Sequence, residues 1–434
     1  MKRYILTVAL FVGVLTQVKA QSATTSFDVD GIKVIFKPTL KNIINARLYF
    51  RAGVADYPAN KAGLESLAIE AATQCGTKKY PGQNFRDAAD KYSIIIGGSA
   101  EQDFGYTSVD CMDKYFNQAW DLFTEAIMNP TFSPTDVELL RDRFITRTRG
   151  TQSSPDKWLD HLIMQNGFEG TPYATDPDGT EQSLKGITID EMKAYYSSIL
   201  NKNRVFLVVV GKINKQELID KIHATLAAMP AKPYQPVNYQ TPAFTDNKVL
   251  VEKRDIPLAY VGAIMNAPKF TDADNVPFRL GMGAFGGLLF SQLRTDLHLS
   301  YSQGADVETL LMPYAQMYVS TPKPKEAVKA MAFLLKKIKE VTLNNAGMKE
   351  LKGEFITGNY VKQQSSSALT ESLGLAEILG GWEYEEHLPD LIDKVTPAQI
   401  NAAFNKYLVG LRWSYLGDPG LANDAADAFK QQIN

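Results

Sequence analysis

The chain has 434 residues, 45% of them hydrophobic, and a formal net charge of −2 at pH 7 from 46 basic and 48 acidic side chains. This length exceeds one ordinary core and predicts two domains or more. The balanced charge gives no broad electrostatic reason to expect nucleic acid or an acidic membrane as a partner. With only Cys75 and Cys111 the chain is not a disulfide scaffold. One bridge between them and two separate buried thiols both stay open.

The first residues have the pattern of an export signal. A basic start at Lys2 and Arg3 is followed by an apolar run over residues 4–15 and by the small residue Ala20. This pattern predicts a secretory signal peptide over 1–20, cleaved after Ala20. The run is too short to span a bilayer, and no later segment approaches about 18 uninterrupted apolar residues, so we expect no stable membrane insertion. We expect a periplasmic protein, with secretion beyond the periplasm as the alternative.

The elements predicted after the signal come in the same order twice. Each half begins with alternating strand-like segments, "FDVDGIKVIFKP" and "NARLYFRAG" in the first and "KVLVEKRD" and "LAYVGAIMNAP" in the second. Helical stretches follow, including 113–129, 134–149 and 325–344. Strands first and helices afterwards favour an α+β fold, in which a mainly antiparallel sheet in each half carries packed helices.

Two segments with one plan indicate an internal duplication. Each has a threonine with Glu or Gln three residues later, which is the capping-box pattern, then a helix with aromatic residues and an apolar strand that ends in glycine. The spacing predicts two domains of about 200 residues each. The paired threonines and their partners are Thr188/Glu191 and Thr396/Gln399. The expected division is a signal peptide over 1–20, a first domain over 21–230, a proline-containing linker over 231–247 and a second domain over 248–434.

The first helix of the chain has an unusual polar position. From Leu64 onward its apolar residues follow one helical face, which places Leu67 and Ala71 one turn apart with Glu70 beside them. Histidines at the outer two positions would make the inverted zinc motif H-x-x-E-H, in which the histidines bind the metal and the glutamate is the general base.

The stretch "ANKAGLESLAIEAATQCGTKKYPGQNF", residues 59–85, resembles the pitrilysin and mitochondrial-processing-peptidase family of zinc peptidases. The Gly-Thr pair at 76–77 and the Tyr-Pro pair at 80–81 match the residues that follow H-x-x-E-H in that family. The resemblance places the two family histidines on Leu67 and Ala71 and retains the glutamate as Glu70. It therefore implies a degenerate zinc motif.

The family's third zinc ligand, a glutamate on a later helix, corresponds by resemblance to Thr148 or Arg149. Residues 143–155 contain no acid and three arginines, and cationic side chains repel Zn²⁺. The four histidines lie far apart in the sequence, so no replacement zinc site is expected either. We predict no metal in this chain. Without a metal, Glu70 is expected to be a solvated or ion-paired carboxylate rather than a general base.

A glycine-rich turn leading into a helix is predicted near residue 281 in the second half, and it precedes Arg294 and Tyr301. By themselves these residues suit close packing, a solvated helix charge and an ordinary strand aromatic. The same peptidase family carries L-x-x-x-L-R with a tyrosine seven residues after the arginine, and Arg294 and Tyr301 match that pair. The resemblance implies that the pair contacts the substrate backbone and the attacked carbonyl at a zinc site, with Gly286 and Gly287 contacting substrate.

Two functional hypotheses follow from a resemblance that covers nearly the whole mature chain. The first is the zinc-free subunit of an exported heterodimeric metallopeptidase, inactive alone, which supplies Arg294 and Tyr301 in trans. Its partner would be a homologous subunit that carries H-x-x-E-H and zinc, and its substrate a peptide or unfolded protein bound as an added strand at a sheet edge. The second is a non-enzymatic peptide-holding or scaffolding protein, such as a homodimer. A serine or cysteine peptidase is disfavoured, because no G-x-S-x-G is present and neither cysteine has a histidine nearby.

Overall fold

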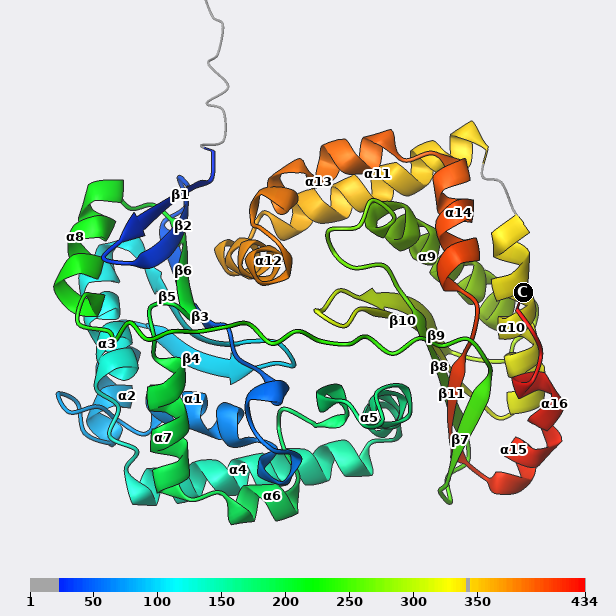
Figure 1. Ribbon diagram of the computed structural model, residues 1–434, viewed down its shortest axis with the longest axis horizontal. Coiled ribbons are helices and arrows are strands. Elements are labelled where there is room, and N and C mark those ends of the chain that lie inside the picture. Colours follow the sequence, from blue (N-terminus) through cyan, green and yellow to red (C-terminus); the bar gives the residue numbers. More distant parts are fainter. Residues whose placement is uncertain (1–22, 341–343, 434) are drawn as a thin grey trace, which may run out of the picture.

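The computed structural model describes residues 23–340 and 344–433 and has two halves, each built on one sheet (Figure 1). The predicted signal peptide lies outside the described residues. The sheet of the first half has six strands in the order β1-β2-β6-β3-β5-β4. Their bounds are β1 (Thr25–Val29), β2 (Ile32–Pro38), β3 (Ile43–Phe50), β4 (Ile95–Ala100), β5 (Gly105–Met112) and β6 (Val205–Gly211).

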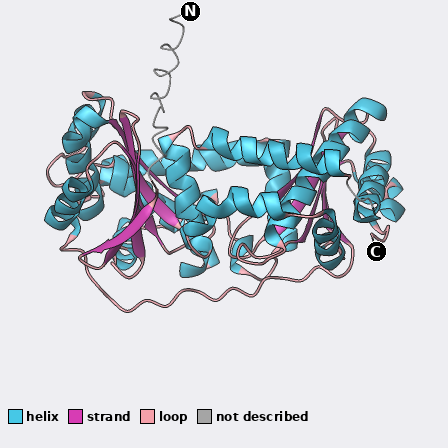
Figure 2. Ribbon diagram, turned by 90° about the horizontal axis from the view of Figure 1, so that it is seen from above, coloured by secondary structure: helices cyan, strands magenta, loops and turns pink. Residues whose placement is uncertain are grey.

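The first half also contains α-helices and short 3₁₀ turns. Four short 3₁₀ turns are η1 (Val54–Asp56), η2 (Ala59–Lys61), η3 (Asp113–Tyr115) and η4 (Pro172–Ala174). The α-helices are α1 (Leu64–Gln74), α2 (Gln83–Asp90), α3 (Phe116–Met128), α4 (Pro134–Ser153), α5 (Pro155–Gly167), α6 (Glu181–Gly186), α7 (Ile189–Ile199) and α8 (Lys215–Leu226). Residues 227–247 hold no helix or strand and run as one long loop from the first half to the second (Figure 2).

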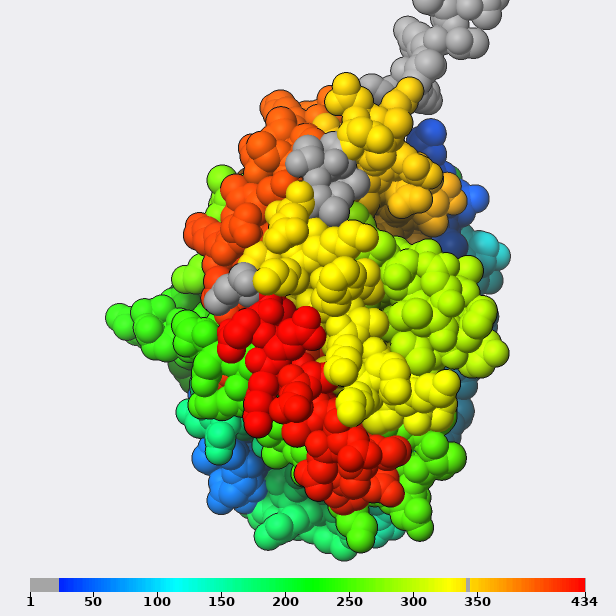
Figure 3. Space-filling model, turned by 90° about the vertical axis from the view of Figure 1, so that its right-hand side faces the viewer, coloured from blue at the N-terminus to red at the C-terminus, as the bar shows by residue number. Residues whose placement is uncertain are grey.

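The second half has a five-stranded sheet in the order β7-β11-β8-β10-β9. Its strands are β7 (Lys248–Lys253), β8 (Ala259–Asn266), β9 (Ser302–Glu308), β10 (Tyr314–Thr321) and β11 (Arg412–Gly417). Its helices are α9 (Asn275–Leu289), the π-helical η5 (Phe290–Asp296), α10 (Pro324–Glu340), α11 (Asn345–Lys362), α12 (Ser366–Leu379), α13 (Glu383–Lys394), α14 (Pro397–Tyr407), α15 (Pro419–Asp424) and α16 (Ala426–Phe429). The outer side of this half is covered by α10 with the C-terminal helices α15 and α16 (Figure 3).

The predicted duplication and α+β class are confirmed by the topology. In each half one strand follows the helix capped by Thr188 or Thr396, namely β6 or β11. It lies parallel beside β2 or β7 and pairs antiparallel with β3 or β8. Both predicted capping boxes are present. The Thr188 backbone N–H donates to Glu191 at 2.8 Å, and the Thr396 backbone N–H donates to Gln399 at 2.8 Å. The same local signals therefore start equivalent helices, α7 and α14.

The two halves exchange one helix each. From the first half, α5 packs on β8 and β11 of the second sheet, and from the second half α12 packs on β3 and β6 of the first sheet. Both helices lie between the sheets, as Figure 1 shows. Asn166 of α5 donates to the Trp413 carbonyl at 2.8 Å, and the Tyr49 hydroxyl donates to the Thr370 carbonyl of α12 at 3.1 Å.

Strand β6 shows how the first sheet is buried on both faces. Leu207 and Val209 belong to the core shared with α1 and α3, whereas Phe206, Val208 and Val210 pack with the side chains of α12. The continuous apolar run of this strand is typical of a strand covered on both sides. The first sheet therefore requires a helix from the other half, which joins the two halves into one body.

Candidate functional site

Helix α1 carries the degenerate motif and is almost wholly buried. It starts after Gly63, whose φ of 88° is in the left-handed region that favours glycine. Leu67 and Ala71 are both 0% exposed and belong to the core of the first half. The two positions that resemble zinc-binding histidines are thus filled by apolar side chains, which have no lone pair to offer a metal.

Glu70 has ionic and hydrogen-bonding partners in place of a metal. Its Oε1 lies 3.3 Å from Nη1 of Arg147 on α4, and its Oε2 accepts a hydrogen bond from Gln74 at 3.0 Å. Arg147 also lies 3.5 Å from the carboxylate of Asp178 and over the ring of Phe144. Burial raises the pKa of Glu70, and Arg147 opposes that rise by favouring the carboxylate. Glu70 is therefore an ion-paired carboxylate.

Arg147 is the residue of α4 that contacts Glu70, whereas the resemblance to the peptidase family pointed to Thr148 or Arg149. Thr148 donates its hydroxyl to the Ile145 carbonyl at 3.0 Å, and Arg149 pairs with Glu181 at 2.7 Å. Successive helical residues differ by about 100° in direction, so Arg147, Thr148 and Arg149 point to different faces of α4. A guanidinium thus lies beside the motif glutamate.

The described residues contain no other arrangement suited to a metal. No group of three or more histidine, cysteine, aspartate or glutamate side chains lies close enough together in residues 23–340 and 344–433 to hold an ion. Cys75 and Cys111 are both free and buried, so the interpretation as two separate thiols holds. Nor is any helix in these ranges both long and apolar enough to cross a bilayer.

Arg294 and Tyr301 are side by side on the surface of the second half. Arg294 lies in η5, and its guanidinium carbon is 5.6 Å from the centroid of the Tyr301 ring and 5.3 Å from that of Phe290. A tight reversal at His298, with φ of 51°, returns the chain so that Tyr301 lies next to Arg294. Tyr301 is 88% exposed. The structure thus brings together the two residues that the sequence pattern paired.

The glycines before this pair lie inside a helix, so the expected glycine-rich turn is wrong. Helix α9 runs from Asn275 to Leu289 and includes Gly281, Gly283, Gly286 and Gly287. Packing accounts for two of them, since a Cβ at Gly281 would lie 2.6 Å from the Phe404 ring and one at Gly283 2.6 Å from the Phe355 ring. A Cβ at Gly286 would lie 3.4 Å from the Ala305 carbonyl of β9, which is an ordinary contact distance. Gly287 has no atom within 4 Å of such a Cβ and is exposed.

Each sheet has a strand edge beside its first long helix. Strand β4 ends the first sheet and lies against α1, and β9 ends the second sheet and lies against α9. Between the halves is a cavity of about 490 Å³ whose wall includes Arg47 and the carboxylates of Glu101, Glu308 and Glu371. Burial raises the pKa of Glu101 to about 6, which leaves it mostly ionised at pH 7. The charged groups of this cavity are therefore mainly acidic.

A duplicated α+β fold with an incomplete inverted zinc motif defines a peptidase-like protein without its own metal ligands. Residues 34–180 match the model of the insulinase family, Peptidase family M16, and residues 186–353 match the Peptidase M16 inactive domain. Together the two matches cover more than half of the chain, which belongs to peptidase family M16. This confirms the resemblance seen in the sequence, and the chain is a peptidase-related protein of the inactive type.

Relatives extend over nearly the whole chain. The non-peptidase homologue YmxG of Helicobacter pylori is 22% identical over 419 residues, which cover 95% of this chain and 90% of that protein. The solved structure of a protease from Helicobacter pylori has a TM-score of 0.84 at 16% identity and covers 91% of this chain and 99% of its own. That of the peptidase M16 inactive domain from Pseudomonas fluorescens has a TM-score of 0.83 at 18% identity, with 91% and 98% covered. At these identities the structures show the shared fold.

Proposed function

We propose that this chain is the zinc-free subunit of an exported heterodimeric M16 peptidase, and that it supplies Arg294 and Tyr301 to the active site of its partner. The observation that carries the proposal is the pair itself, a guanidinium next to a phenol that is 88% exposed. Both groups donate hydrogen bonds. Phe290 and Leu297, which are 49% and 48% exposed, add apolar surface around the pair, and an exposed apolar patch favours a partner.

The partner in this proposal contributes everything that α1 lacks. Glu70 is held by Arg147, and Leu67 and Ala71 are core residues, so the motif on α1 offers no place for a metal-activated water. A homologous H-x-x-E-H subunit supplies the zinc, the water and the general base. Arg294 and Tyr301 then donate to the oxygen on which charge develops when the carbonyl is attacked, an interaction that is strong in a site without bulk water.

The proposed substrate is an extended peptide or an unfolded protein. Two sheet edges, β4 and β9, offer backbone groups to which such a chain can add as a strand. The carboxylates of Glu101, Glu308 and Glu371 favour basic side chains in the bound peptide. Export rests on the predicted signal peptide over residues 1–20, with the periplasm as the proposed location and secretion beyond it as the alternative.

Reconstitution with an H-x-x-E-H subunit from the same organism tests the proposal. The two chains are expected to form a one-to-one complex in size-exclusion chromatography with light scattering, and to cleave a basic unstructured peptide only when both are present. A partner whose motif glutamate is replaced by glutamine is the control for contaminating proteases. Stoichiometric zinc and full activity in this chain alone would overturn the proposal, as would the absence of any complex.

The second candidate function is a non-enzymatic peptide-holding or scaffolding protein. It is favoured by the Helicobacter pylori relative, a non-peptidase homologue whose match covers 95% of this chain. It predicts a homodimer without any H-x-x-E-H subunit and peptide binding without turnover. The same chromatography and cleavage assays separate the two functions.

A further inference from the structure

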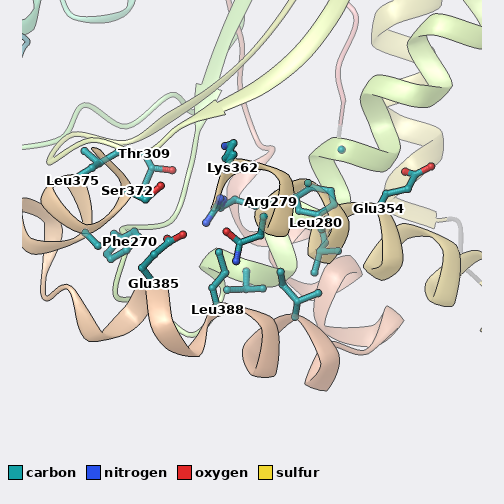
Figure 4. A pocket seen from close by; sticks show the side chains of 17 residues that line it. Phe270, Arg279, Leu280, Thr309, Glu354, Lys362, Ser372, Leu375, Glu385 and Leu388 are labelled. Atoms are coloured by element: carbon teal, nitrogen blue, oxygen red, sulfur yellow. The ribbon is translucent and has the colours of Figure 1, made fainter. Parts of the chain in front are cut away.

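The helical layer of the second half lines an open cavity that neither the motif helix nor the Arg/Tyr pair reaches. Its volume is about 470 Å³, and α9, α11, α12 and α13 supply its walls together with Phe270 and Thr309 (Figure 4). Sites for small ligands commonly measure about 300–1,000 Å³. The cavity is therefore large enough for a small molecule, and the role proposed above does not use it.

Besides Glu354, three charged side chains from three helices line this cavity. Arg279 comes from α9, Lys362 from the end of α11 and Glu385 from α13. Figure 4 shows the charged ends of Arg279 and Glu385 directed toward the same space, whereas the carboxylate of Glu354 points away. None of the three forms an ion pair with another described residue. Burial raises the pKa of Glu385, and Arg279 and Lys362 oppose the rise from a distance. Two cations thus face one carboxylate.

Asn359 adds an unused hydrogen-bond donor to the same wall. This residue of α11 is 8% exposed, and its Nδ2 has no acceptor among the described residues. Buried donors without a partner are rare in native proteins because they have lost their bonds to water. Donors and positive charge are therefore in excess around the cavity, and an anionic acceptor would complement both.

The remaining lining is largely apolar. Phe270, Leu280, Leu375 and Leu388 supply side chains that carry no polar atom. A ligand that complements the whole wall has one anionic end and an apolar body. A single carboxylate suits the charges better than a doubly charged phosphate, because Glu385 cancels one of the two cations.

We propose that this cavity binds a small carboxylic acid with an apolar body, its carboxylate facing Arg279, Lys362 and Asn359 and its apolar part packing on Phe270 and Leu388. Either a free carboxylic acid or the carboxy terminus of an apolar peptide supplies this chemistry. The site is independent of the proposed subunit role.

Gly358 provides a way to close the cavity without removing any of its charges. It lies on α11 and lines the cavity, and a Cβ built there would meet no atom within 4 Å. Gly358→Leu is therefore expected to fold, since leucine favours a helix more than glycine does, while its side chain takes up ligand space. Gly353 lies on the same helix, has equally open surroundings and does not line the cavity, so Gly353→Leu is the matched control.

Isothermal titration calorimetry on the mature chain tests the proposal with two pairs of probes. Octanoate is compared with octanol, and N-acetyl-phenylalanyl-leucine with its carboxy-terminal amide. We expect one saturable site for at least one of the two acids, and binding about tenfold or more weaker for its neutral counterpart, as loss of a charged hydrogen bond predicts. Binding of octanoate alone identifies a free acid as the ligand class, and binding of the peptide acid alone identifies a carboxy terminus.

Variants locate the site. Gly358→Leu and the double variant Arg279→Gln/Lys362→Gln are each expected to weaken acid binding about tenfold or more. Gly353→Leu and Lys349→Gln, both on α11 and outside the cavity, are expected to bind as the parent chain does. Circular dichroism on each variant checks the fold. The proposal is overturned if neither acid saturates a site at up to about 10 mM, if neutral probes bind equally well, or if Gly358→Leu and Gly353→Leu bind alike.

Discussion

The guanidinium of Arg147 lies 3.3 Å from the carboxylate of Glu70, across the gap between α4 and α1. The pair places a positive charge beside the only motif residue that is retained from H-x-x-E-H. Because the carboxylate is partly desolvated, it depends on this cation more than a surface glutamate would. In place of a zinc site, the motif thus holds an ion pair next to the packed core of the first half.

Restoring the two histidines should not restore zinc binding. In Leu67→His/Ala71→His, Arg147 still faces the site and repels the ion. Adding Arg147→Glu supplies a third ligand from the position that reaches the motif, and we expect about one zinc per chain by mass spectrometry of the metal content. The matched control replaces Arg149, which pairs with Glu181, by glutamate instead. Equal zinc in the double variant or in the Arg149 control would contradict this assignment.

Stability is expected to fall as pH rises, because of Glu65. This residue of α1 is fully buried, accepts hydrogen bonds from Tyr195 and the Gly53 backbone, and has its pKa raised by burial from 4.5 to about 8. The folded state therefore holds a proton that the unfolded state releases, so the stability present below pH 4.5 is lost as pH rises toward 8. The loss is a few kcal/mol at about 1.4 kcal/mol per pKa unit.

Urea unfolding at several pH values measures this effect. In Glu65→Gln the amide cannot titrate, so the free energy of unfolding should change much less between pH 5 and 8 than in the parent chain. Glu350→Gln, on the exposed part of α11, is the matched control and should retain the parent slope. A parent slope that survives in Glu65→Gln would show that another group carries the proton.

Tyr301→Phe should reduce turnover in the reconstituted complex of the proposed function. The phenol donates more strongly to the transition state than to the substrate, so kcat is expected to fall by about 10²–10³, the usual effect of losing one such donor. Arg294→Ala should also raise KM, because it removes a contact to the substrate backbone.

Tyr360→Phe is the control for that measurement, since Tyr360 is also exposed but lies on α11. Zinc content and complex size should stay unchanged in all three variants. Turnover within about threefold of the parent for Arg294→Ala/Tyr301→Phe would remove the pair from the active site.

The two cysteines should be unreactive in the folded chain. Cys75 and Cys111 are buried and free, and burial raises the pKa of each thiol to about 12, so almost no thiolate exists at pH 8. A thiol reagent such as Ellman's should modify them only as fast as the protein unfolds, and should count two thiols in guanidinium chloride. Fast labelling of either cysteine in the native protein would contradict the burial.

A methyl group at Gly374 should weaken the contact between the halves. A Cβ there would lie 2.1 Å from the Tyr49 ring, which is itself 1% exposed and unable to move freely. Gly374→Ala is therefore expected to lower the free energy of unfolding by about 1–3 kcal/mol. Gly353→Ala, at an open helical position, should raise it by up to about 1 kcal/mol. Thermal unfolding of the parent chain and both variants measures these changes. If Gly374→Ala were as stable as the parent chain, α12 would be able to move away from Tyr49 without loss of stability.

The sequence by itself determined the elements that depend on local signals. Apolar spacing defined α1, and threonine caps with a partner three residues later marked α7 and α14, because these interactions lie within one helical turn. The absence of histidine at positions 67 and 71 is also visible without a structure. The repeat of these signals was enough to predict two α+β halves.

Only the tertiary structure decided which distant residues meet. It selected Arg147 rather than its neighbours as the partner of Glu70, because one residue turns a helical side chain by about 100°. It placed four glycines inside α9, and at Gly281 and Gly283 close packing against Phe404 and Phe355 leaves no room for a side chain. Helices α5 and α12 each pack on the sheet of the opposite half, and Arg279, Lys362 and Glu385 line one cavity. In both cases the segments lie far apart along the chain, and no periodic pattern in the sequence links them. Such contacts depend on how whole elements pack, which local patterns do not encode.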